Sequence, residues 1–568
     1  MPVWKGREMR EAGTRRWDTW WGVVVVLGLV ACQRPSLQSA TPTPAATASS
    51  MPTQSPVLPT PTPVPARPLG WAENGALYLV HVGSFYDSNG DGSGDLRGLQ
   101  QKLDYLNDGD PSTTDDLGVN VLCLLPIFSA ASPHGFDTLD HFAIRPEYGT
   151  RADLRNLVTE CHRRGMKVVL EYVMGYVSDQ QPFFRHAYDH LPSVYSDWFL
   201  WLNYLQTRSK TLDNAPTLPL LNGASEGVQE YALRVARYWM DLDGDGDCSD
   251  GVDGYLCDRP ALLPGAFWEH LRAQSKRLRP DFLLMASVSG SGQGVAASYV
   301  GQFDAVLDVL VHSALVGSGS ENAGSVLGGT GQSDLIATAL SQRMGLYPQG
   351  TLCVGYLNSC DTDRIMSVVR GDVQRAKLAA TIVFALPGMP MLYYGEEIGM
   401  TGLRGAGQPF GSEHCREPMD WYAAEEGSGM PTWFRPLERG NRPGDGVSVQ
   451  EQTSDHASLL SLYRRLIRLR GAHSALRLGA CERVPLVQDQ PYACAYLRQD
   501  AQERVLVVLN LDRKPVEATL QLGSASLPAG VWNVVDLLGS RMLPPFSGGS
   551  YALELGAQEA LVLLLERP

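Results

Sequence analysis

Residues 151–174, RADLRNLVTECHRRGMKVVLEYVM, hold the pattern that decides the fold. Apolar side chains recur with helical spacing up to Arg164, and the run from Met166 to Met174 is then almost continuously apolar and rich in valine. The first half is typical of an amphipathic helix and the second of a buried strand. A helix that leads directly into a buried strand indicates one unit of a parallel sheet.

The same alternation fills the chain from about Gly70 to Leu469. Strands are predicted at Ala76–Val82, Val119–Leu125, Met166–Met174, Gly254–Cys257, Phe282–Val288 and Met391–Tyr394. Helices are predicted at Arg151–Arg164, Val228–Met240, Ala266–Leu278 and Gln374–Phe384. Repeated strand-then-helix units over roughly 400 residues favour a (β/α)8 barrel.

Two departures from this rhythm predict further domains. Residues 177–222 are rich in Tyr, Trp, Leu and Pro and form an insertion after the third strand. Residues 471–568 contain short alternating strands such as Val505–Leu511 and Ala560–Leu565, which predict a small β-sandwich. The predicted fold class is therefore α/β, with a (β/α)8 TIM barrel over residues 70–470, the insertion 177–222 and a C-terminal β-sandwich.

The composition excludes two broad classes of protein. The 568 residues include 47 Lys+Arg and 61 Asp+Glu, which gives a formal net charge of −14. Nucleic-acid binders usually carry a basic surface, so no nucleic acid is expected as a partner. A hydrophobic fraction of 44% excludes global disorder.

The N-terminus predicts export rather than folded structure. Several arginines precede the apolar run Trp20–Val30, and the sequence Leu29-Val30-Ala31-Cys32 follows the pattern of a bacterial lipobox. We therefore interpret residues 1–31 as a signal peptide, with a lipid on Cys32 that anchors the protein to the outside of the cell membrane. The alternative is an uncleaved membrane anchor. Residues 32–69 are rich in Pro and Thr and are interpreted as an extended linker.

Two acidic loops are candidate calcium sites. The first places oxygen side chains at alternate positions, with glycines between them, and its predicted ligands are Asp87, Asn89, Asp91, Ser93 and Asp95. The second, from Asp241 to Asp247, has the first half of an EF-hand-like loop. It has Val252 where such a loop carries its bidentate glutamate. Solvated turns are the alternative for both loops.

Nine cysteines lie beyond the linker, which is an odd number. Cys481 and Cys494 flank a predicted hairpin and are the best disulfide candidates. Buried free thiols are the alternative.

Several segments, taken in order, resemble the α-amylase family, glycoside hydrolase family 13. They are SFYDSNGDGSGDLRGL, LGVNVLCLLPIF, HGFD, EYGT, GMKVVLEYV, GVDGYLCD, DTDRIMS and LPGMPMLYYGEEIGM. The resemblance implies a (β/α)8 barrel with a domain B insertion, an α-glucan or maltooligosaccharide as ligand, and a retaining mechanism with two carboxylates.

The resemblance also implies site residues, and two of the three catalytic carboxylates are present. Asp258 stands at the nucleophile position and Asp361 at the position of the third carboxylate. Ser287 occupies the position of the acid/base glutamate, and a serine hydroxyl cannot protonate a leaving oxygen near neutral pH. Leu256 replaces the pocket arginine. The predicted substrate contacts are Phe136, Asp137, Tyr176 and Arg364.

Aromatic residues of the insertion have two interpretations. Tyr195, Trp198, Trp201 and Tyr204 either stack on sugar rings or form a small local core.

Three functions fit these features. The first is an exported α-amylase-like lipoprotein with impaired catalysis that binds a glucan or a protein partner. The second is an active hydrolase or transglycosylase with a non-standard acid/base. The third is a structural ancillary subunit of a membrane complex. Ser287 and Leu256 speak against the second, and the lipid anchor suits the first and third.

Overall fold

A computed structural model describes residues 70–288, 301–317, 324–329, 332–347, 351–404, 413–434, 442–488, 490–524, 527 and 530–568. The chain divides into two compact units, Met1–Pro63 and Val64–Pro568, and all described residues belong to the second. The predicted signal peptide and linker lie outside the described residues. Within the described part, no helix combines the length and the apolar composition that crossing a bilayer requires.

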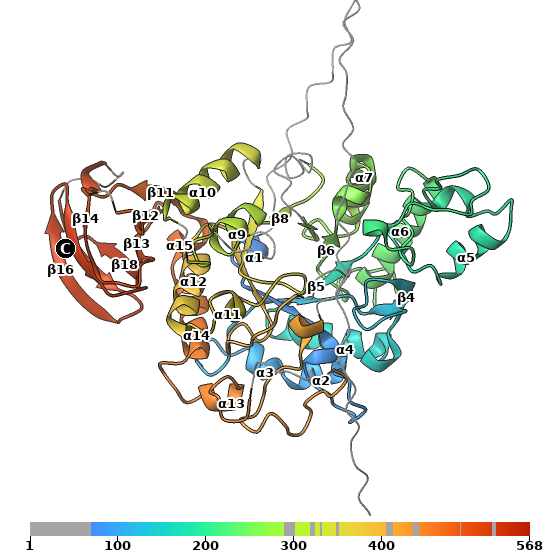
Figure 1. Ribbon diagram of the computed structural model, residues 1–568, viewed down its shortest axis with the longest axis horizontal. Coiled ribbons are helices and arrows are strands. Elements are labelled where there is room, and N and C mark those ends of the chain that lie inside the picture. Colours follow the sequence, from blue (N-terminus) through green and yellow to red (C-terminus); the bar gives the residue numbers. More distant parts are fainter. Residues whose placement is uncertain are drawn as a thin grey trace, which may run out of the picture. The chain divides into compact units, whose positions relative to one another are not determined.

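Eight parallel strands close into a barrel (Figure 1). In barrel order they are β1 (Leu77–Val80), β10 (Met389–Tyr393), β9 (Leu352–Tyr356), β8 (Ala305–Leu307), β7 (Leu283–Ser287), β6 (Gly254–Asp258), β5 (Lys167–Tyr172) and β2 (Val121–Leu124). The prediction of a (β/α)8 barrel is confirmed. Because all eight strands run the same way, their carboxyl ends meet at one face, where such barrels place their sites.

Helices outside the barrel shield the strands from water (Figure 1). The main ones are α2 (Leu96–Gln101), α4 (Arg151–Arg163), α6 (Glu226–Met240), α7 (Gly265–Leu278), α9 (Val309–Leu315), α10 (Asp334–Leu346), α12 (Val373–Ala385) and α14 (Leu459–Ala472). Shorter helices are α1 (Gly70–Glu73), α3 (Leu103–Leu106), α11 (Ile365–Val368), α13 (Val449–Gln452) and α15 (Ser474–Leu478).

Residues 151–174 show how the sequence determines a helix and the strand that follows it. Thr150 and Asp153 form a capping box, in which each side chain accepts a hydrogen bond from the other's backbone N–H. The helix α4 then buries Leu154, Leu157 and Cys161 on one face, at helical spacing. A turn leads into β5, whose residues from Val168 onward are all buried.

The segment after β5 leaves the barrel, as the sequence predicts. It contains α5 (Pro182–Asp189) and irregular loops, and it lies between β5 and α6. Of its aromatic residues, Trp198 packs against Tyr195 with ring centroids 5.0 Å apart. Trp201 stacks on Phe184 with ring centroids 5.8 Å apart. Tyr195, Trp198 and Trp201 are therefore part of a local core. Tyr204 instead is 97% exposed. A second, two-stranded sheet, β3 (Phe128–Ala130) with β4 (Thr138–Ile144), follows β2.

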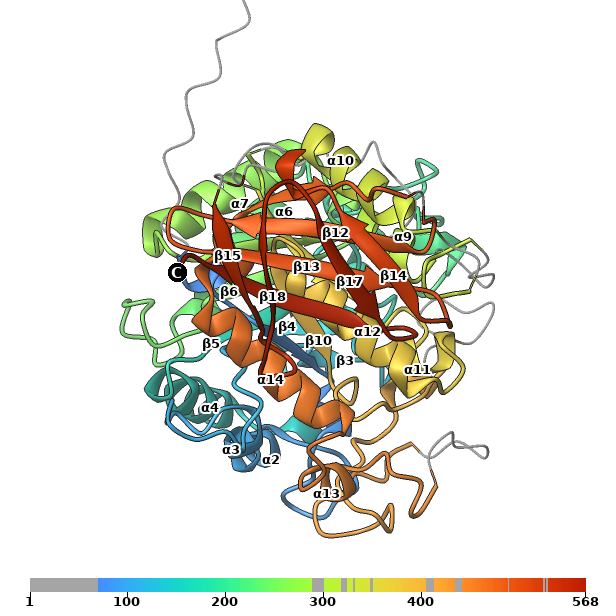
Figure 2. The same ribbon diagram turned by 90° about the vertical axis from the view of Figure 1, so that its left-hand side faces the viewer.

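The C-terminal part is antiparallel (Figure 2). One sheet has the order β11 (Ala480–Val484), β12 (Ala493–Gln499), β13 (Arg504–Asn510), β18 (Ala560–Glu566), β15 (Val531–Asp536) and β16 (Arg541–Ser547), and the other pairs β14 (Val516–Leu520) with β17 (Tyr551–Leu555). Cys494 and Tyr496 face the barrel core, whereas Ala495 and Leu497 face a separate core inside these sheets. Alternation along β12 therefore joins the sheet to the barrel.

The disulfide expectation is wrong, because the register of the hairpin separates its two cysteines. Cys481 lies opposite Arg498 in the β11–β12 pair, four positions from Cys494. Both thiols are free, as are the other seven cysteines of the described residues. The alternative interpretation, free thiols, holds, and all but Cys481 are buried.

Candidate active site

The catalytic positions implied by the sequence lie at the carboxyl ends of neighbouring strands. Asp258 ends β6 and Ser287 ends β7, and the two residues are partners in the parallel register. Leu256 and Met285 are also register partners, two residues earlier on the same strands and therefore deeper in the barrel. Side chains two residues apart on a strand face the same side, so Leu256 lines the barrel interior below Asp258. The structure thus brings Asp258, Ser287 and Leu256 together.

Tyr176 covers Asp258. Its hydroxyl donates a hydrogen bond to Asp258 Oδ2 at 2.7 Å, and its own side chain is fully buried. Asp258 retains only 3% of its exposure. In this conformation the carboxylate that would attack a sugar is almost completely buried, and one of its oxygens is engaged by the Tyr176 hydroxyl.

Burial also raises the pKa values of two carboxyl groups of the site, Asp258 and Glu171. Removal from water raises the pKa of Asp258 to about 7, although the Tyr176 hydroxyl and the Arg259 guanidinium act in the opposite direction. Burial raises the pKa of Glu171 well above its usual range, and the charges of Asp258 and Asp361 add to this. With a pKa of about 7, only about half of the Asp258 carboxyl groups are ionised near neutral pH, and only the ionised form can act as a nucleophile.

Arg259 supplies a positive charge beside Asp258. Its backbone has φ +42°, a left-handed conformation that is strained for a residue with a side chain. Its Nη1 donates to Asp213 Oδ2 at 2.9 Å, and Asp213 belongs to the insertion and also has positive φ, +48°. This ion pair fastens the insertion to the end of β6.

Asp361 forms an ion pair with Arg416. The guanidinium of Arg416 is buried and lies 3.7 Å from Asp361 Oδ1. It also lies 5.8 Å from the ring centroid of Phe136, which is itself buried. The Asp361 side chain keeps 31% of its exposure, so of the two retained family carboxylates it is the one that water reaches.

A polar cleft of about 570 Å³ lies between the loop that precedes β4 and the insertion, and Asp213, the partner of Arg259, is part of its lining. Its lining includes Ser132, His134 and Asp137 on one side and Asp213 and Thr217 on the other. Asp137 accepts hydrogen bonds from the Ser132 backbone N–H and hydroxyl at 3.2 and 2.9 Å. Burial lowers the pKa of His134 to about 3, so its imidazole is neutral. Hydroxyl, imidazole and carboxylate groups around one cleft suit a polyhydroxylated ligand.

Arg364 has a different place from the sugar contact that the sequence predicts. Its side chain is 1% exposed, and its Nη1 donates to the Tyr394 carbonyl at 2.7 Å. The guanidinium lies over the rings of Tyr393 and Tyr394, 4.7 and 4.9 Å from their centroids. It is enclosed by protein because it braces the end of β10, which is a packing role.

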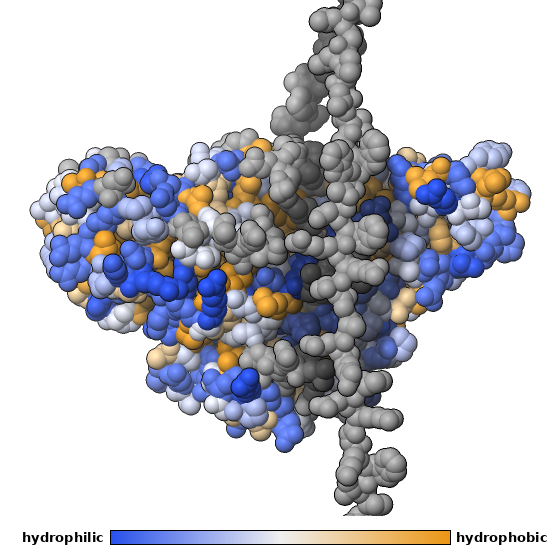
Figure 3. Space-filling view, viewed as in Figure 1, coloured by the Kyte–Doolittle hydropathy of each residue, from blue (hydrophilic) through white to orange (hydrophobic). Residues whose placement is uncertain are grey.

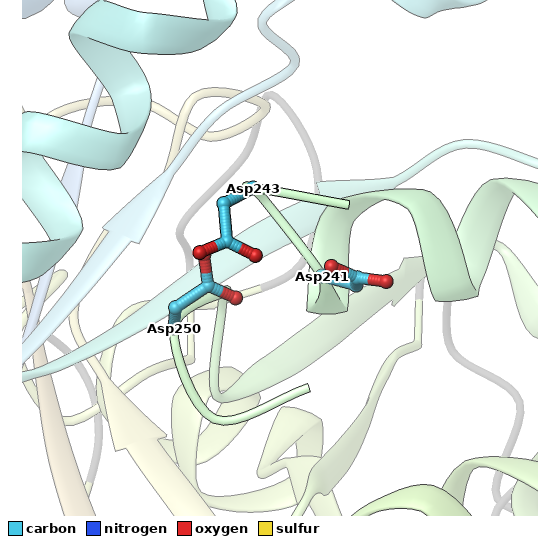
Figure 4. Close-up of side chains that lie close together, drawn as sticks. All are labelled: Asp241, Asp243 and Asp250. Carbon is cyan, nitrogen blue, oxygen red and sulfur yellow. The ribbon is translucent and has the colours of Figure 1, made fainter. Parts of the chain in front are cut away.

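Carboxylates that could hold a cation meet at the second acidic loop. Oxygens of Asp241, Asp243 and Asp250 lie within 4.8 Å of one another (Figure 4). Burial and the charges of Asp243 and Asp241 raise the pKa of Asp250. Arg155 is the nearby cation, with Nη2 3.1 Å from Asp243 Oδ2. This geometry fits a hard divalent cation with oxygen ligands.

The first loop has the same turn but no such cluster among the described residues. Asp87 accepts from the N–H groups of Gly90 and Gly92, as Asp241 does from Gly244 and Gly246. Asp95 caps α2 by accepting from the Gly98 N–H. Calcium at Asp87, Asn89, Asp91, Ser93 and Asp95 stays a prediction.

Comparisons with known proteins agree with this geometry. The profile of the family described as "Alpha amylase, catalytic domain" matches residues 79–479, and that of "Maltogenic Amylase, C-terminal domain" matches residues 486–562. The chain belongs to the α-amylase family.

Individual relatives extend this assignment. "Alpha-amylase 3" of Dictyoglomus thermophilum is 29% identical over 461 residues, which cover 78% of this chain and 86% of that protein. The crystal structure of an α-amylase from H. orenii has a TM-score of 0.74 and 29% identity, over 87% of this chain and 99% of that one. An α-amylase of Geobacillus thermoleovorans, solved with acarbose, has a TM-score of 0.68 and 23% identity over 87% and 99% of the two chains.

Three residues of this α-amylase-family site were given no site role by sequence reasoning. Arg416 and Arg259 are not among the site residues that the family resemblance implies. Asp250 lies beyond the part of the second loop that resembles an EF-hand. Arg259 could have been predicted as a site residue because it directly follows Asp258 in the sequence. Nothing in the sequence indicates that Asp213 is its partner.

Proposed function

We propose that this α-amylase-family protein is an exported, lipid-anchored protein that binds α-glucans or maltooligosaccharides and hydrolyses them poorly or not at all. The observation that carries the proposal is the state of Asp258, which is buried beneath Tyr176 with Ser287 as its neighbour on the next strand. The nucleophile position is covered, and the acid position holds a group that cannot serve as an acid.

Binding is part of the proposal because polar groups line the cleft between the loop before β4 and the insertion. Hydrogen-bond donors and acceptors of Ser132, His134, Asp137 and Thr217 line it. Relatives that act as amylases, and one solved with acarbose, support a glucan as the ligand class.

The alternative, an active hydrolase with another acid, would need a carboxyl group near Ser287. Glu171 has the required raised pKa, but it is the register partner of Leu256, two residues before Asp258. At about 3.3 Å per strand residue its backbone lies roughly 6–7 Å deeper in the barrel. Its 4% exposure leaves no path to a glycosidic oxygen, so the geometry favours the binding protein.

Calorimetric titration with maltoheptaose tests the proposal. We expect wild-type protein to bind it, and His134→Ala or Asp137→Ala to weaken binding by about tenfold or more, since each removes a hydrogen-bonding group from the cleft. Asp104→Asn is the matched control, because it lies in a separate polar groove between α2 and α4. Absence of binding by the wild type would contradict glucan binding and leave a partner-binding or ancillary-subunit function.

A bound calcium ion is also proposed, with Asp241, Asp243 and Asp250 as ligands. A cation that binds only the folded protein stabilises it by about 3 kcal/mol when its concentration is a hundred times Kd. We therefore expect a chelator to lower the Tm of the wild type.

Two single variants locate the ion. Asp250→Asn should remove most of the chelator's effect, whereas Asp91→Asn, in the first loop, should not. An effect removed by Asp91→Asn alone would place the ion at the first loop. A Tm that does not respond to the chelator would show that both loops are only turns.

A further inference from the structure

The outer end of the insertion carries a concentration of exposed apolar side chains (Figure 3). Fourteen large apolar residues of the described chain are exposed, and six of them lie within residues 188–205. They are Tyr188 at 41%, Leu191 at 52%, Val194 at 78%, Leu202 at 54%, Tyr204 at 97% and Leu205 at 63%. We call this set the apolar tip. Concentration of this kind marks an interaction surface, because scattered exposed side chains would be unremarkable.

The apolar tip is built on ordered turns. In the turn Leu202–Gln206 the Asn203 side chain accepts hydrogen bonds from the N–H groups of Thr207 and Arg208 at 3.0 and 3.1 Å. The Leu202 N–H donates to the Arg208 carbonyl at 2.7 Å. These bonds close the turn, so Tyr204 and Leu205 are held outward and cannot collapse onto the insertion's core.

The second turn is held in the same way and adjoins the first. His186 Nδ1 lies 2.7 Å from the Ser193 hydroxyl, which fixes the loop that carries Leu191 and Val194. Trp201 Nε1 donates to the Ser196 carbonyl at 2.7 Å and so connects the two turns. The result is one preorganised surface with little conformational entropy to lose on binding.

Two unpaired cations adjoin the tip. Arg208 and Lys210 are exposed, and neither forms an ion pair with another described residue. The three carboxylates of residues 188–213 have partners: Asp189 pairs with Arg185, Asp213 pairs with Arg259, and Asp197 accepts a hydrogen bond from the Ser225 hydroxyl. Apolar and tyrosine side chains beside two unpaired cations match a phospholipid surface, which offers anionic headgroups above an acyl interior.

We propose that the apolar tip docks onto an anionic phospholipid bilayer, with Leu202, Tyr204 and Leu205 at the headgroup boundary and Arg208 and Lys210 against lipid phosphates. How the chain reaches the bilayer rests on the proposed lipid anchor at Cys32. The linker of residues 32–69 would span about 3 Å per residue if extended, which is ample for this face to meet the membrane. Docking would fix the orientation of the cleft relative to the surface.

An environment-sensitive fluorophore on Tyr204→Cys tests the docking, in a full chain that also carries Cys481→Ala so that the partly exposed native thiol is not labelled. The probes are vesicles of phosphatidylcholine alone or mixed with phosphatidylglycerol. We expect a blue shift, and quenching by nitroxide-labelled lipid, in the mixed vesicles. The control label on Met542→Cys, a 64% exposed residue of the C-terminal sheets, should stay in water.

Charge variants test the cationic rim. Arg208→Glu with Lys210→Glu should weaken vesicle partition by about thirtyfold or more, since each cation near an anionic surface contributes about 1 kcal/mol and both charges are reversed. Arg513→Glu with Lys514→Glu, an exposed pair on the C-terminal part, should leave partition unchanged.

Three results would overturn the docking. The label at position 204 could stay in water while the chain is bound to vesicles. It could shift without lipid as protein concentration rises, which would show that a second copy covers the tip. It could shift with maltoheptaose alone, which would assign the tip to sugar. Flotation of the full chain reports the lipid anchor separately, so the two proposals fail independently.

Discussion

Ser287→Glu alone restores no measurable hydrolysis of maltoheptaose, although it supplies the missing carboxyl group. The reason is that Tyr176 still covers Asp258 and no arginine lies below it. Adding Leu256→Arg places a guanidinium beside Glu171, its register partner, and adding Tyr176→His removes the ring from Asp258. We expect the triple variant to hydrolyse roughly 10²–10⁴ times faster than the wild type, which is the usual contribution of a general acid.

The matched control replaces only the acid. Ser287→Gln in the same Leu256→Arg and Tyr176→His background has the same size and polarity but carries no transferable proton. It should be as inactive as the wild type when reducing-sugar release is measured. Equal activity of the two triple variants would show that the proton donor lies elsewhere.

Cys32→Ala should move the protein from the membrane fraction to the soluble fraction in cell fractionation. Several acyl chains hold a protein firmly on a bilayer, and the substitution removes the atom that carries them. The barrel should stay intact, because the linker between it and Cys32 cannot build a core.

The control for this change is Cys481→Ala, which alters a partly exposed thiol far along the chain and should leave the fractionation unchanged. If the Cys32→Ala protein remains in the membrane fraction, and detergent but not salt extracts it, the Trp20–Val30 segment is an uncleaved anchor.

Much of the barrel could be predicted because its strands are long apolar runs beside amphipathic helices. Six of the eight barrel strands coincide with the predicted ones. The two strands that were not predicted, β8 and β9, were missed for physical reasons. β8 is only three residues long, and β9 contains Gly355 and follows a polar stretch, so neither shows a clear period.

The site was only partly predictable, because its decisive features join residues that are remote in sequence. The replacement of the acid/base glutamate by Ser287 could be predicted, because Ser287 lies in a strand that the sequence predicts. Coverage of Asp258 by Tyr176 depends on a contact across 82 positions, and the Arg259 and Asp213 pair joins the barrel to the insertion. Asp250 enters its carboxylate cluster through the fold of the loop.

We propose that the barrel and its cleft persist while the chemistry is lost. The most direct test of this proposal is chromatographic product analysis after purified wild-type protein is incubated for a long period with maltoheptaose at saturating concentration. We expect bound but unchanged maltoheptaose, with no shorter or longer oligosaccharides above the level of a protein-free control. Steady formation of maltose, glucose or transfer products, abolished by Asp258→Asn, would contradict it.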